Sequence, residues 1–307
     1  MYHIIVNPTS KSGLGRKKWE ELKSLLLKEK VTYNVQFTRV PMSAYKCTRR
    51  ITNVDNGTEN KIVVLGGDGT LNEVVNGIMD YEYTYVTYLP TGSSNDLARD
   101  MGISSDTSML IPKFKQLRES LPAMDLGEVK FKGGRRKFIV SSGIGFDAAV
   151  CEQSQDSAIK SILNLLKLGK LTYLCTALRL LMKRSYIQAE LYVDGSDEPL
   201  HVKDMLFLAV MNHRYEGGGF MFAPDADAYD GYLDICYAAD VSLPRILFLL
   251  PLALRGKHIE KKGIYTLRCK SIEIRTDSKQ PVHTDGEICG HFDAITYRCY
   301  EKLLKFV

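Results

Sequence analysis

The stretch KIVVLGGDGTLNEVVNGI, residues 61–78, contains the pattern on which the interpretation of the first part of the chain depends. An apolar run typical of a buried strand passes through a glycine turn into a helical pattern. Turns of this kind usually present backbone N–H groups to a phosphate at the N-terminus of the helix. This turn also contains a carboxylate, Asp68, and no lysine follows its glycines. Because a carboxylate alone would repel phosphate, a site with a divalent cation between the two is expected.

On both sides of this stretch, strand and helix patterns alternate through the first 125 residues. Strand patterns cover residues 3–8, 32–38, 61–65 and 85–90, and helix patterns cover 19–29, 42–52 and 71–79. Another helix is expected to start in TGSSNDLAR, residues 91–99. This alternation predicts a three-layer α/β domain with a mainly parallel sheet covered on both faces. The loops that follow its strands should converge on one edge of the sheet, where such domains bind ligands.

The pattern changes after about Asp125, where short strand patterns follow one another between turn residues. This predicts an all-β, sandwich-like second domain. We therefore divide the chain into an α/β nucleotide-binding domain, 1–125, and a β-rich domain, 126–291. A helical segment that alternates apolar and basic residues, 158–184, is inserted in the second domain. The C-terminal tail, about 292–307, is ambiguous and could return to the first domain.

Composition excludes several classes of protein. The 307 residues are 45% hydrophobic and 25% charged, as in a globular protein with a full core. The excess of Lys and Arg (41) over Asp and Glu (36) hints weakly at acidic partners such as nucleotides or anionic lipids. Without an arginine-rich arm or zinc-finger spacing, nucleic acid is not expected as a partner.

Membrane-spanning segments are not expected either. The apolar run LPRILFLLPLALRG, residues 243–256, is interrupted by prolines and arginine, and no run approaches the roughly 20 apolar residues that span a bilayer. Seven scattered cysteines and an N-terminus that already reads as a strand favour a reducing cytoplasm. We expect a cytoplasmic protein that contacts at most the inner face of the membrane, and only transiently.

Each motif also has a plain structural interpretation. GGDGT can be an ordinary strand–helix turn with an Asp cap, although the second glycine turn, in residues 90–99, makes this less attractive. TDGE, residues 284–287, fits a type I′ hairpin turn, and PDADAYDG, residues 224–231, fits either a solvated acidic turn or a hard-cation site. For residues 158–184, helices packed on the domain are favoured over an element at the membrane interface.

Taken in order, these motifs carry a resemblance. NPTSKSGLGRK, GGDGTLNEVVNG, PTGSSNDLAR, DLGEV, GIGFDAAV, NHRYEGGGFMFAPDADAYDGYLDI and HTDGE resemble the diacylglycerol kinase catalytic-domain family, in its bacterial soluble lipid kinase branch, over residues 3 to about 295. GGDGT alone is shared with NAD kinases and phosphofructokinases, whereas its combination with SSNDLAR and DGE is more specific. The resemblance implies a phosphofructokinase- or NAD-kinase-like first domain and an ATP cleft between the two domains.

The resemblance also implies roles for particular residues. Glu287 matches the proton acceptor, with Asp285 beside it and Asp68 in the catalytic acidic network. The positions that match ATP-binding residues are Asn7, Pro8, Thr9, Ser10, Thr38, Gly66, Gly67, Asp68, Gly69, Thr70, Leu71, Asn72, Glu73, Ser93 and Asn95. The positions that match magnesium-linked residues are Asp227, Asp230 and Tyr232 in one site, and Asp68, Asp96 and Asp125 in another. Two departures are Lys11, where many members have glycine, and Ser93, which keeps the hydroxyl of the usual threonine.

These observations predict a lipid kinase that uses ATP and Mg²⁺. It would transfer the γ-phosphate of ATP to a lipid hydroxyl, most simply that of diacylglycerol or a related lipid, and diacylglycerol would give phosphatidic acid. During the reaction it would be peripherally bound to an anionic membrane surface. Two alternatives stay open: an NAD kinase-like enzyme, and a non-catalytic nucleotide- or lipid-binding module. The oligomeric state is open as well, with a homodimer as one alternative, and none of the six histidines is given a role.

Overall fold

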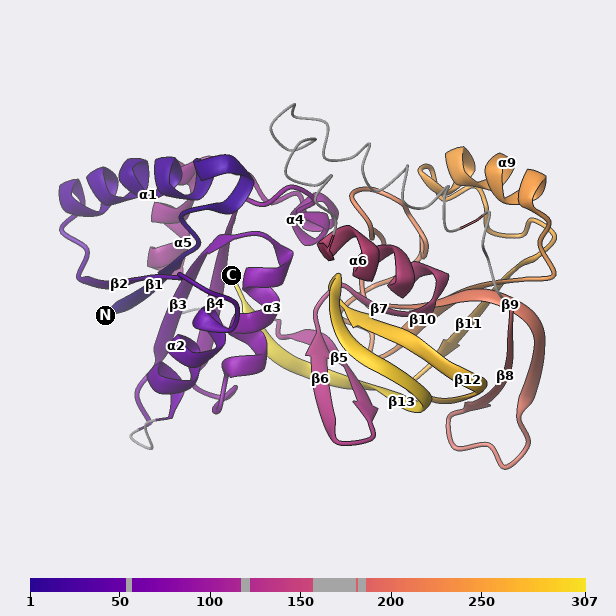
Figure 1. Ribbon diagram of the computed structural model, residues 1–307. Coiled ribbons are helices and arrows are strands. Elements are labelled where there is room, and N and C mark those ends of the chain that lie inside the picture. Colours follow the sequence, from indigo (N-terminus) through magenta and orange to yellow (C-terminus); the bar gives the residue numbers. More distant parts are fainter. Residues whose placement is uncertain (54–56, 117–121, 157–180, 182–185) are drawn as a thin grey trace. The chain divides into compact units, whose positions relative to one another are not determined.

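A computed structural model describes residues 1–53, 57–116, 122–156, 181 and 186–307. Apart from Leu181, the predicted helical segment 158–184 lies outside the described residues. The chain divides into two compact units, which are described separately below. Unit 1 contains Met1–Leu126 and Tyr300–Val307, and unit 2 contains Gly127–Cys299 (Figure 1).

Unit 1 is built on a parallel sheet with the strand order β2-β1-β3-β4, and the end of β13 pairs in parallel with β4. Its strands are β1 (Tyr2–Val6), β2 (Tyr33–Phe37), β3 (Asn60–Gly66), β4 (Thr84–Pro90) and the last residues of β13 (Glu287–Phe306). Its helices are α1 (Ser10–Lys28), α2 (Ser43–Thr52), α3 (Asp68–Gly77), α4 (Asp96–Met101), the short 3₁₀ helix η1 (Thr107–Met109) and α5 (Leu110–Gln116). The strands of this sheet that sequence patterns predicted are therefore all present.

The direction in which the strands are added reverses between β1 and β3. The chain passes from β1 outward to β2, returns to β3 and then continues to β4 on the other side. Because such crossovers are right-handed, α1 lies on one face of the sheet while α2 and α3 lie on the other (Figure 1). Trp19 and Leu22 of α1 are buried against Ile4 and Val63 of the sheet. The three-layer α/β fold is confirmed, and its reversal creates a topological switch point between β1 and β3.

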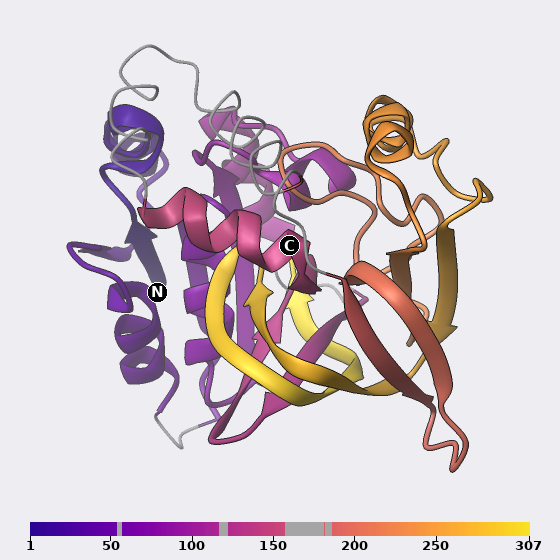
Figure 2. The same cartoon turned by 45° about the vertical axis from the view of Figure 1, so that its right-hand side comes forward.

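Unit 2 is antiparallel, with the strand order β11-β10-β9-β7-β12-β13 (Figure 2). Besides β13, the strands of this unit are β5 (Met124–Phe131), β6 (Gly134–Phe138), β7 (Ser141–Gly145), β8 (Ile187–Val193), β9 (Leu200–Met211), β10 (Leu233–Ala239), β11 (Ile264–Cys269) and β12 (Ser271–Thr284). The long strands β9 and β12 pair with β7 over one part of their length and with β8 over another. This double pairing folds the sheet around an apolar core that includes Phe138, Leu208, Ile274 and Tyr297, so the sandwich-like prediction is confirmed.

Two helices of unit 2 were not predicted, α6 (Phe146–Asp156) and α9 (Leu243–Ala253). Helix α9 contains Pro244 in its first turn, where the missing N–H costs nothing, and a second proline, Pro251, further along. The prolines made its sequence look like an interrupted apolar run. Among the described residues, no helix is both long and apolar enough to cross a membrane.

Candidate active site

The loops after β1 and β3 are joined at the switch point. The backbone N–H of Asn7 donates to the carbonyl of Leu65 at 2.8 Å, and Asn7 Nδ2 donates to Thr70 Oγ1 at 3.2 Å. Asn7 Oδ1 in turn accepts from the backbone N–H and the hydroxyl of Thr9, at 3.3 and 3.0 Å. The first predicted nucleotide loop is therefore held against the GGDGT turn by direct hydrogen bonds.

The loop after β1 contains an unusual run of left-handed backbone. Lys11, Ser12 and Gly13 have φ values of 43°, 57° and 94°. Glycine adopts such angles without strain, whereas a residue with a Cβ does so at a cost of about 1 kcal/mol. The structure thus explains why glycine suits the position of Lys11 in the family pattern, and it places an exposed lysine in this loop.

The two glycine turns of unit 1 are in van der Waals contact. The N–H of Thr91 donates to the carbonyl of Gly66 at 2.7 Å. A methyl group on Gly92 would lie 2.4 Å from the Cα of Gly67, so neither turn tolerates a side chain here. The reason is close approach of the two backbones. Asn95 fixes the second turn, because its Oδ1 accepts from the N–H of Gly92 at 2.9 Å.

Two of the predicted acidic residues, Asp68 and Asp96, are joined by a hydrogen bond. Asp68 is the first residue of α3, and its Oδ2 accepts from the backbone N–H of Asp96 at 3.1 Å. Burial, followed by the charges of Asp68 and Asp96, raises the pKa of the Tyr88 hydroxyl well above its usual value. Asp96 is buried and pairs with Arg99. Carboxylates gathered at the start of a helix are positioned to hold a hard cation beside phosphate bound on the helix N-terminus.

Other predicted residues turn out to hold the scaffold. The carboxylate of Glu73 accepts from the backbone N–H groups of Met42 and Ala44, at 2.8 and 3.0 Å, and so caps α2. Asp125 is fully buried, and its Oδ1 accepts from the N–H of Lys302 in the returning strand β13 at 2.6 Å. The remaining positions are Pro8 and Ser10 after β1, Thr38 after β2, Gly69, Leu71 and Asn72 in the first turn of α3, and the exposed Ser93 before α4.

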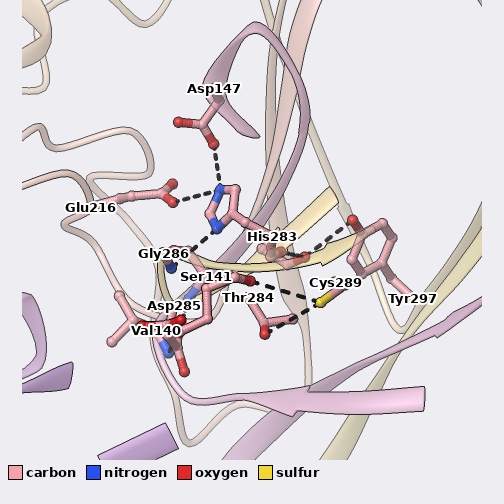
Figure 3. A network of polar contacts seen from close by, with 12 residues as sticks. Val140, Ser141, Asp147, Glu216, His283, Thr284, Asp285, Gly286, Cys289 and Tyr297 are labelled. Carbon is pink, nitrogen blue, oxygen red and sulfur yellow. Dashed lines mark hydrogen bonds and ion pairs between the residues drawn. The ribbon is translucent and has the colours of Figure 1, made fainter. Parts of the chain in front are cut away.

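In unit 2 the DGE sequence forms the hairpin turn between β12 and β13. Asp285 and Gly286 have φ values of 47° and 81°, as in a type I′ turn. Figure 3 shows the side chain of Asp285 directed at the connection between β6 and β7. Its two oxygens accept from the backbone N–H groups of Ile139, Val140 and Ser141 at 2.8–3.0 Å. Asp285 therefore anchors the turn, while the next carboxylate, Glu287, is exposed at the start of β13.

A buried histidine beneath this turn was missed in the sequence. His283 is fully buried, and its Nε2 lies 2.7 Å from Asp147 Oδ2 and 3.2 Å from Glu216 Oε1 (Figure 3). Its other nitrogen, Nδ1, accepts from the N–H of Gly286 at 3.2 Å. A methyl group on Gly143 would lie 2.1 Å from the Asp147 oxygen and 2.6 Å from His283 Nε2, so a side chain there would displace this pair. The cluster thus connects two carboxylates to the backbone of the DGE turn.

Charge explains how the cluster holds its protons. Burial lowers the pKa of His283, but the carboxylates of Asp147 and Glu216 outweigh burial and raise it to about 9. Because Nδ1 accepts a hydrogen bond, it carries no proton while that bond is kept. Binding of an additional proton at Nδ1 would therefore break the hydrogen bond from Gly286. Cys151 belongs to the same surroundings, since burial and then Asp147, Glu216 and Glu287 raise the pKa of its thiol well above its usual value.

Among the described residues, Asp147, Cys151 and His283 also place one potential metal-ligating atom each within 4.8 Å of one another. Asp147, Glu216 and His283 all occur in motifs that carried the family resemblance, GIGFDAAV, NHRYEGGGF and HTDGE. The positions of Asp147 and His283 differ by 136 residues, so nothing local in the sequence indicated their contact.

The second predicted magnesium site lies in the loop before β10. Asp227 is exposed, and its Oδ1 accepts from the N–H of Tyr229 at 3.1 Å. Asp230 pairs with Arg268, whose guanidinium lies 4.8 Å from the centre of the Tyr232 ring. The carboxylates and backbone carbonyls of this loop are the oxygen donors that suit a hard cation. With Arg268 balancing Asp230, Asp227 is the better placed of the two to contribute a ligand.

Comparison with known proteins identifies the family to which each part of the chain is similar. Residues 1–129 match the family model described as the diacylglycerol kinase catalytic domain, and residues 139–306 match the one described as the YegS C-terminal NAD kinase beta sandwich-like domain. The chain belongs to the diacylglycerol kinase family. The resemblance drawn from the sequence motifs is confirmed, and the protein is an enzyme of the kinase class.

Relatives of this family match nearly the whole chain. The Bacillus subtilis (strain 168) protein named "Putative lipid kinase YtlR" is 30% identical, over 94% of this chain and 94% of its own length. The diacylglycerol kinase of the same organism is 28% identical, over 94% of this chain and 89% of its own.

Solved structures show the same fold. The crystal structure of a "putative diacylglycerol kinase" from Bacillus anthracis str. Sterne has a TM-score of 0.76 at 21% identity, covering 100% of this chain and 96% of that one. Yeast NADH kinase complexed with NADH has a TM-score of 0.54 at 12% identity, covering 100% of this chain and 82% of that chain. At these identities the similarity concerns the fold alone.

Proposed function

We propose that this kinase transfers the γ-phosphate of ATP to the hydroxyl of diacylglycerol or a closely related membrane lipid. The observation that carries the proposal is the pair of joined glycine turns at the switch point of unit 1. Backbone N–H groups at the start of α3 and the carboxylates of Asp68 and Asp96 occur there together. That combination suits polyphosphate accompanied by a divalent cation better than either ligand alone.

In this proposal the residues of unit 1 bind and orient the phosphates. Gly66, Gly67 and Gly92 allow the backbone to approach them closely, and Thr70 and Ser10 supply hydroxyl groups from hydrogen-bonded positions. Mg²⁺ would be held through Asp68 and Asp96, with a structural ion at Asp227. When bound, it would offset the negative charge of the phosphates, which explains why no lysine follows the glycines.

The residues of unit 2 would manage the proton. Glu287 is exposed on a turn that Asp285 fixes by three hydrogen bonds, so its carboxylate can accept the proton of the attacking hydroxyl. Asp285 has both oxygens engaged with backbone N–H groups, which suits a positioning role. A lipid is the favoured acceptor because relatives that match nearly the whole chain are named "Putative lipid kinase YtlR" and "Diacylglycerol kinase". Such a substrate requires peripheral contact with a membrane.

A radiolabelled ATP assay on a total lipid extract, with Mg²⁺, tests the proposal. We expect a single labelled lipid product, and we expect its formation to fall by at least about a thousandfold in Asp68→Ala and Glu287→Ala. Glu198→Gln, which changes an exposed glutamate in the turn between β8 and β9, is the control and should keep full activity. Chelation of Mg²⁺ should stop the reaction.

The alternatives have distinct outcomes. Labelled NADP from NAD, with no labelled lipid, would support the NAD kinase-like enzyme. If the protein without substitutions binds ATP but phosphorylates no lipid, a non-catalytic binding module is supported. Full lipid phosphorylation by the Glu287→Ala variant would remove Glu287 from the proposed mechanism.

A further inference from the structure

Helix α9 is apolar on both of its faces. On its inner face, Ile246 and Leu249 are buried in one cluster with residues of β9 and β10, and Ala253 is buried as well. Its outer face is also apolar, although it is exposed. Leu247, Phe248 and Leu254 have 43%, 61% and 50% of their surface accessible. A helix that is hydrophobic all round normally has a partner on every side.

The exposed residues form a continuous stripe. The exposed residues are Pro244, Leu247, Phe248, Pro251 and Leu254. They occupy positions i, i+3, i+4, i+7 and i+10, which lie on one side of a helix. We call these five residues the α9 face. Contiguous apolar surface of this kind marks a docking site, whereas single exposed apolar side chains such as Leu200 are ordinary.

Basic residues accompany the α9 face. Arg255, Lys257, Lys261 and Lys262 follow the helix directly, and all four are exposed. Residues 243–262 contain five basic side chains and a single acidic one, Glu260. The buried His258 adds no charge, because burial lowers its pKa to about 4.

The basic segment is held close to the helix. Arg245 of α9 donates from Nε to the carbonyl of Lys262 at 2.8 Å. The carbonyl of Ala253, at the end of α9, accepts from the N–H of Met221 at 2.8 Å, which ties the helix to the preceding loop. The apolar stripe and the positive charges are therefore parts of one fixed surface.

We propose that the α9 face and its basic segment dock this protein on an anionic lipid bilayer. Apolar side chains would enter the boundary between headgroups and acyl chains, and the lysines and arginine would contact acidic headgroups. This inference rests on the proposed function in one respect, since a lipid substrate gives the enzyme a reason to bind membranes. The charge pattern favours a bilayer over a second copy of the chain, because two identical basic segments would repel each other.

Vesicle co-sedimentation without ATP tests the docking surface independently of catalysis. The probes are vesicles of phosphatidylcholine with phosphatidylglycerol, and vesicles of phosphatidylcholine alone, both without diacylglycerol. We expect binding to the anionic vesicles that weakens with salt. Leu247→Gln with Phe248→Gln should lower the partition coefficient at least about tenfold. Lys261→Gln with Lys262→Gln should lower it about tenfold on anionic vesicles only.

Matched variants control for general surface effects. Leu200 has 42% of its surface accessible, close to the value for Leu247, and lies at the start of β9. Leu200→Gln should bind vesicles as the unchanged protein does, and so should Lys203→Gln with Lys279→Gln. All variants should keep the thermal midpoint of the parent, because the substituted side chains are exposed. On diacylglycerol dispersed in detergent micelles, the α9 variants should keep their activity, which separates docking from catalysis.

A direct reporter completes the test. Phe248→Trp adds a second tryptophan to a chain that has one, and its fluorescence should shift to shorter wavelength with anionic vesicles and be quenched by brominated acyl chains. Unchanged fluorescence, or equal vesicle binding by the Leu247→Gln and Leu200→Gln variants, would overturn the proposal. Self-association that disappears in the α9 variants, without vesicle binding, would show that a second copy covers this face instead.

Discussion

The two ring nitrogens of His283 contact different groups, and substitutions can separate the contacts. Asparagine keeps an acceptor near the position of Nδ1, which receives the Gly286 N–H, whereas glutamine keeps a donor near Nε2, which faces Asp147 and Glu216. If His283 positions the DGE turn, loss of the Gly286 contact should displace Glu287. We therefore expect kcat for lipid phosphorylation to fall about 10- to 100-fold in His283→Gln and about threefold or less in His283→Asn, with KM for ATP unchanged in both.

A merely structural histidine would respond differently, since both variants would then lose activity in proportion to lost stability. His201→Gln, which changes an exposed histidine of β9, provides the control. Equal kcat values for the two His283 variants would contradict a positioning role. Metal analysis of the purified protein is informative as well: stoichiometric zinc bound through Asp147, Cys151 and His283 would identify the cluster as a metal site.

At the scale of elements, the returning strand β13 depends on one buried carboxylate. Asp125, at the second residue of β5, accepts from the N–H of Lys302, which has a left-handed φ of 51°. Removing the carboxylate takes the acceptor from that partly buried N–H and leaves a gap where the fully buried Asp125 side chain was. Asp125→Ala should therefore lower the free energy of unfolding by about 1–3 kcal/mol.

Chemical denaturation followed by circular dichroism measures this loss, and the exposed Asp293 supplies a matched control in the same strand as Lys302. Asp293→Ala should change stability by less than about 0.5 kcal/mol. If Asp125→Ala is as stable as the control while losing kinase activity, Asp125 acts in the magnesium network that the family resemblance implies and not in the scaffold.

For the molecule as a whole, two buried histidines shape the dependence of stability on pH. The pKa of His283 is raised from 6.5 to about 9, so its contribution is fully present below pH 6.5 and is lost as pH rises through 9. The pKa of His258 is lowered to about 4 by burial, so its contribution is present above pH 6.5 and is lost as pH falls through 4. Together they favour maximal stability near pH 6.5.

Urea denaturation at a series of pH values checks this expectation. Between pH 6.5 and 9.5, the free energy of unfolding of the unchanged protein should fall by about 3 kcal/mol more than that of His283→Gln. The difference follows from the shift in the pKa of the histidine. Parallel stability curves for the two proteins over this range would show that the two carboxylates do not raise the pKa of His283.

Local patterns were sufficient for the fold class and for the positions of the two glycine turns. The alternation of strands and helices is written in periodicity over ten to twenty residues. The GGDGT and SSNDLAR turns each follow a strand directly, so their convergence on one edge of the sheet could be predicted from chain order. The roles of Glu73 and Asp285 could not, because a motif shows which residue is present but not which backbone groups its oxygens will accept from.

The sequence by itself determined that this protein has a parallel α/β unit with a phosphate-type loop, a β-rich unit and the motifs of the diacylglycerol kinase family. These properties depend on residues that are close together in the sequence, because strand and helix periodicity and short turns are set by local backbone geometry. Only the tertiary structure decided that His283 lies between Asp147 and Glu216 beneath the DGE turn, and that the outer face of α9 is exposed. The histidine and its two carboxylates come from segments far apart in the sequence, and α9 is apolar on both sides, so its sequence does not show which side is buried.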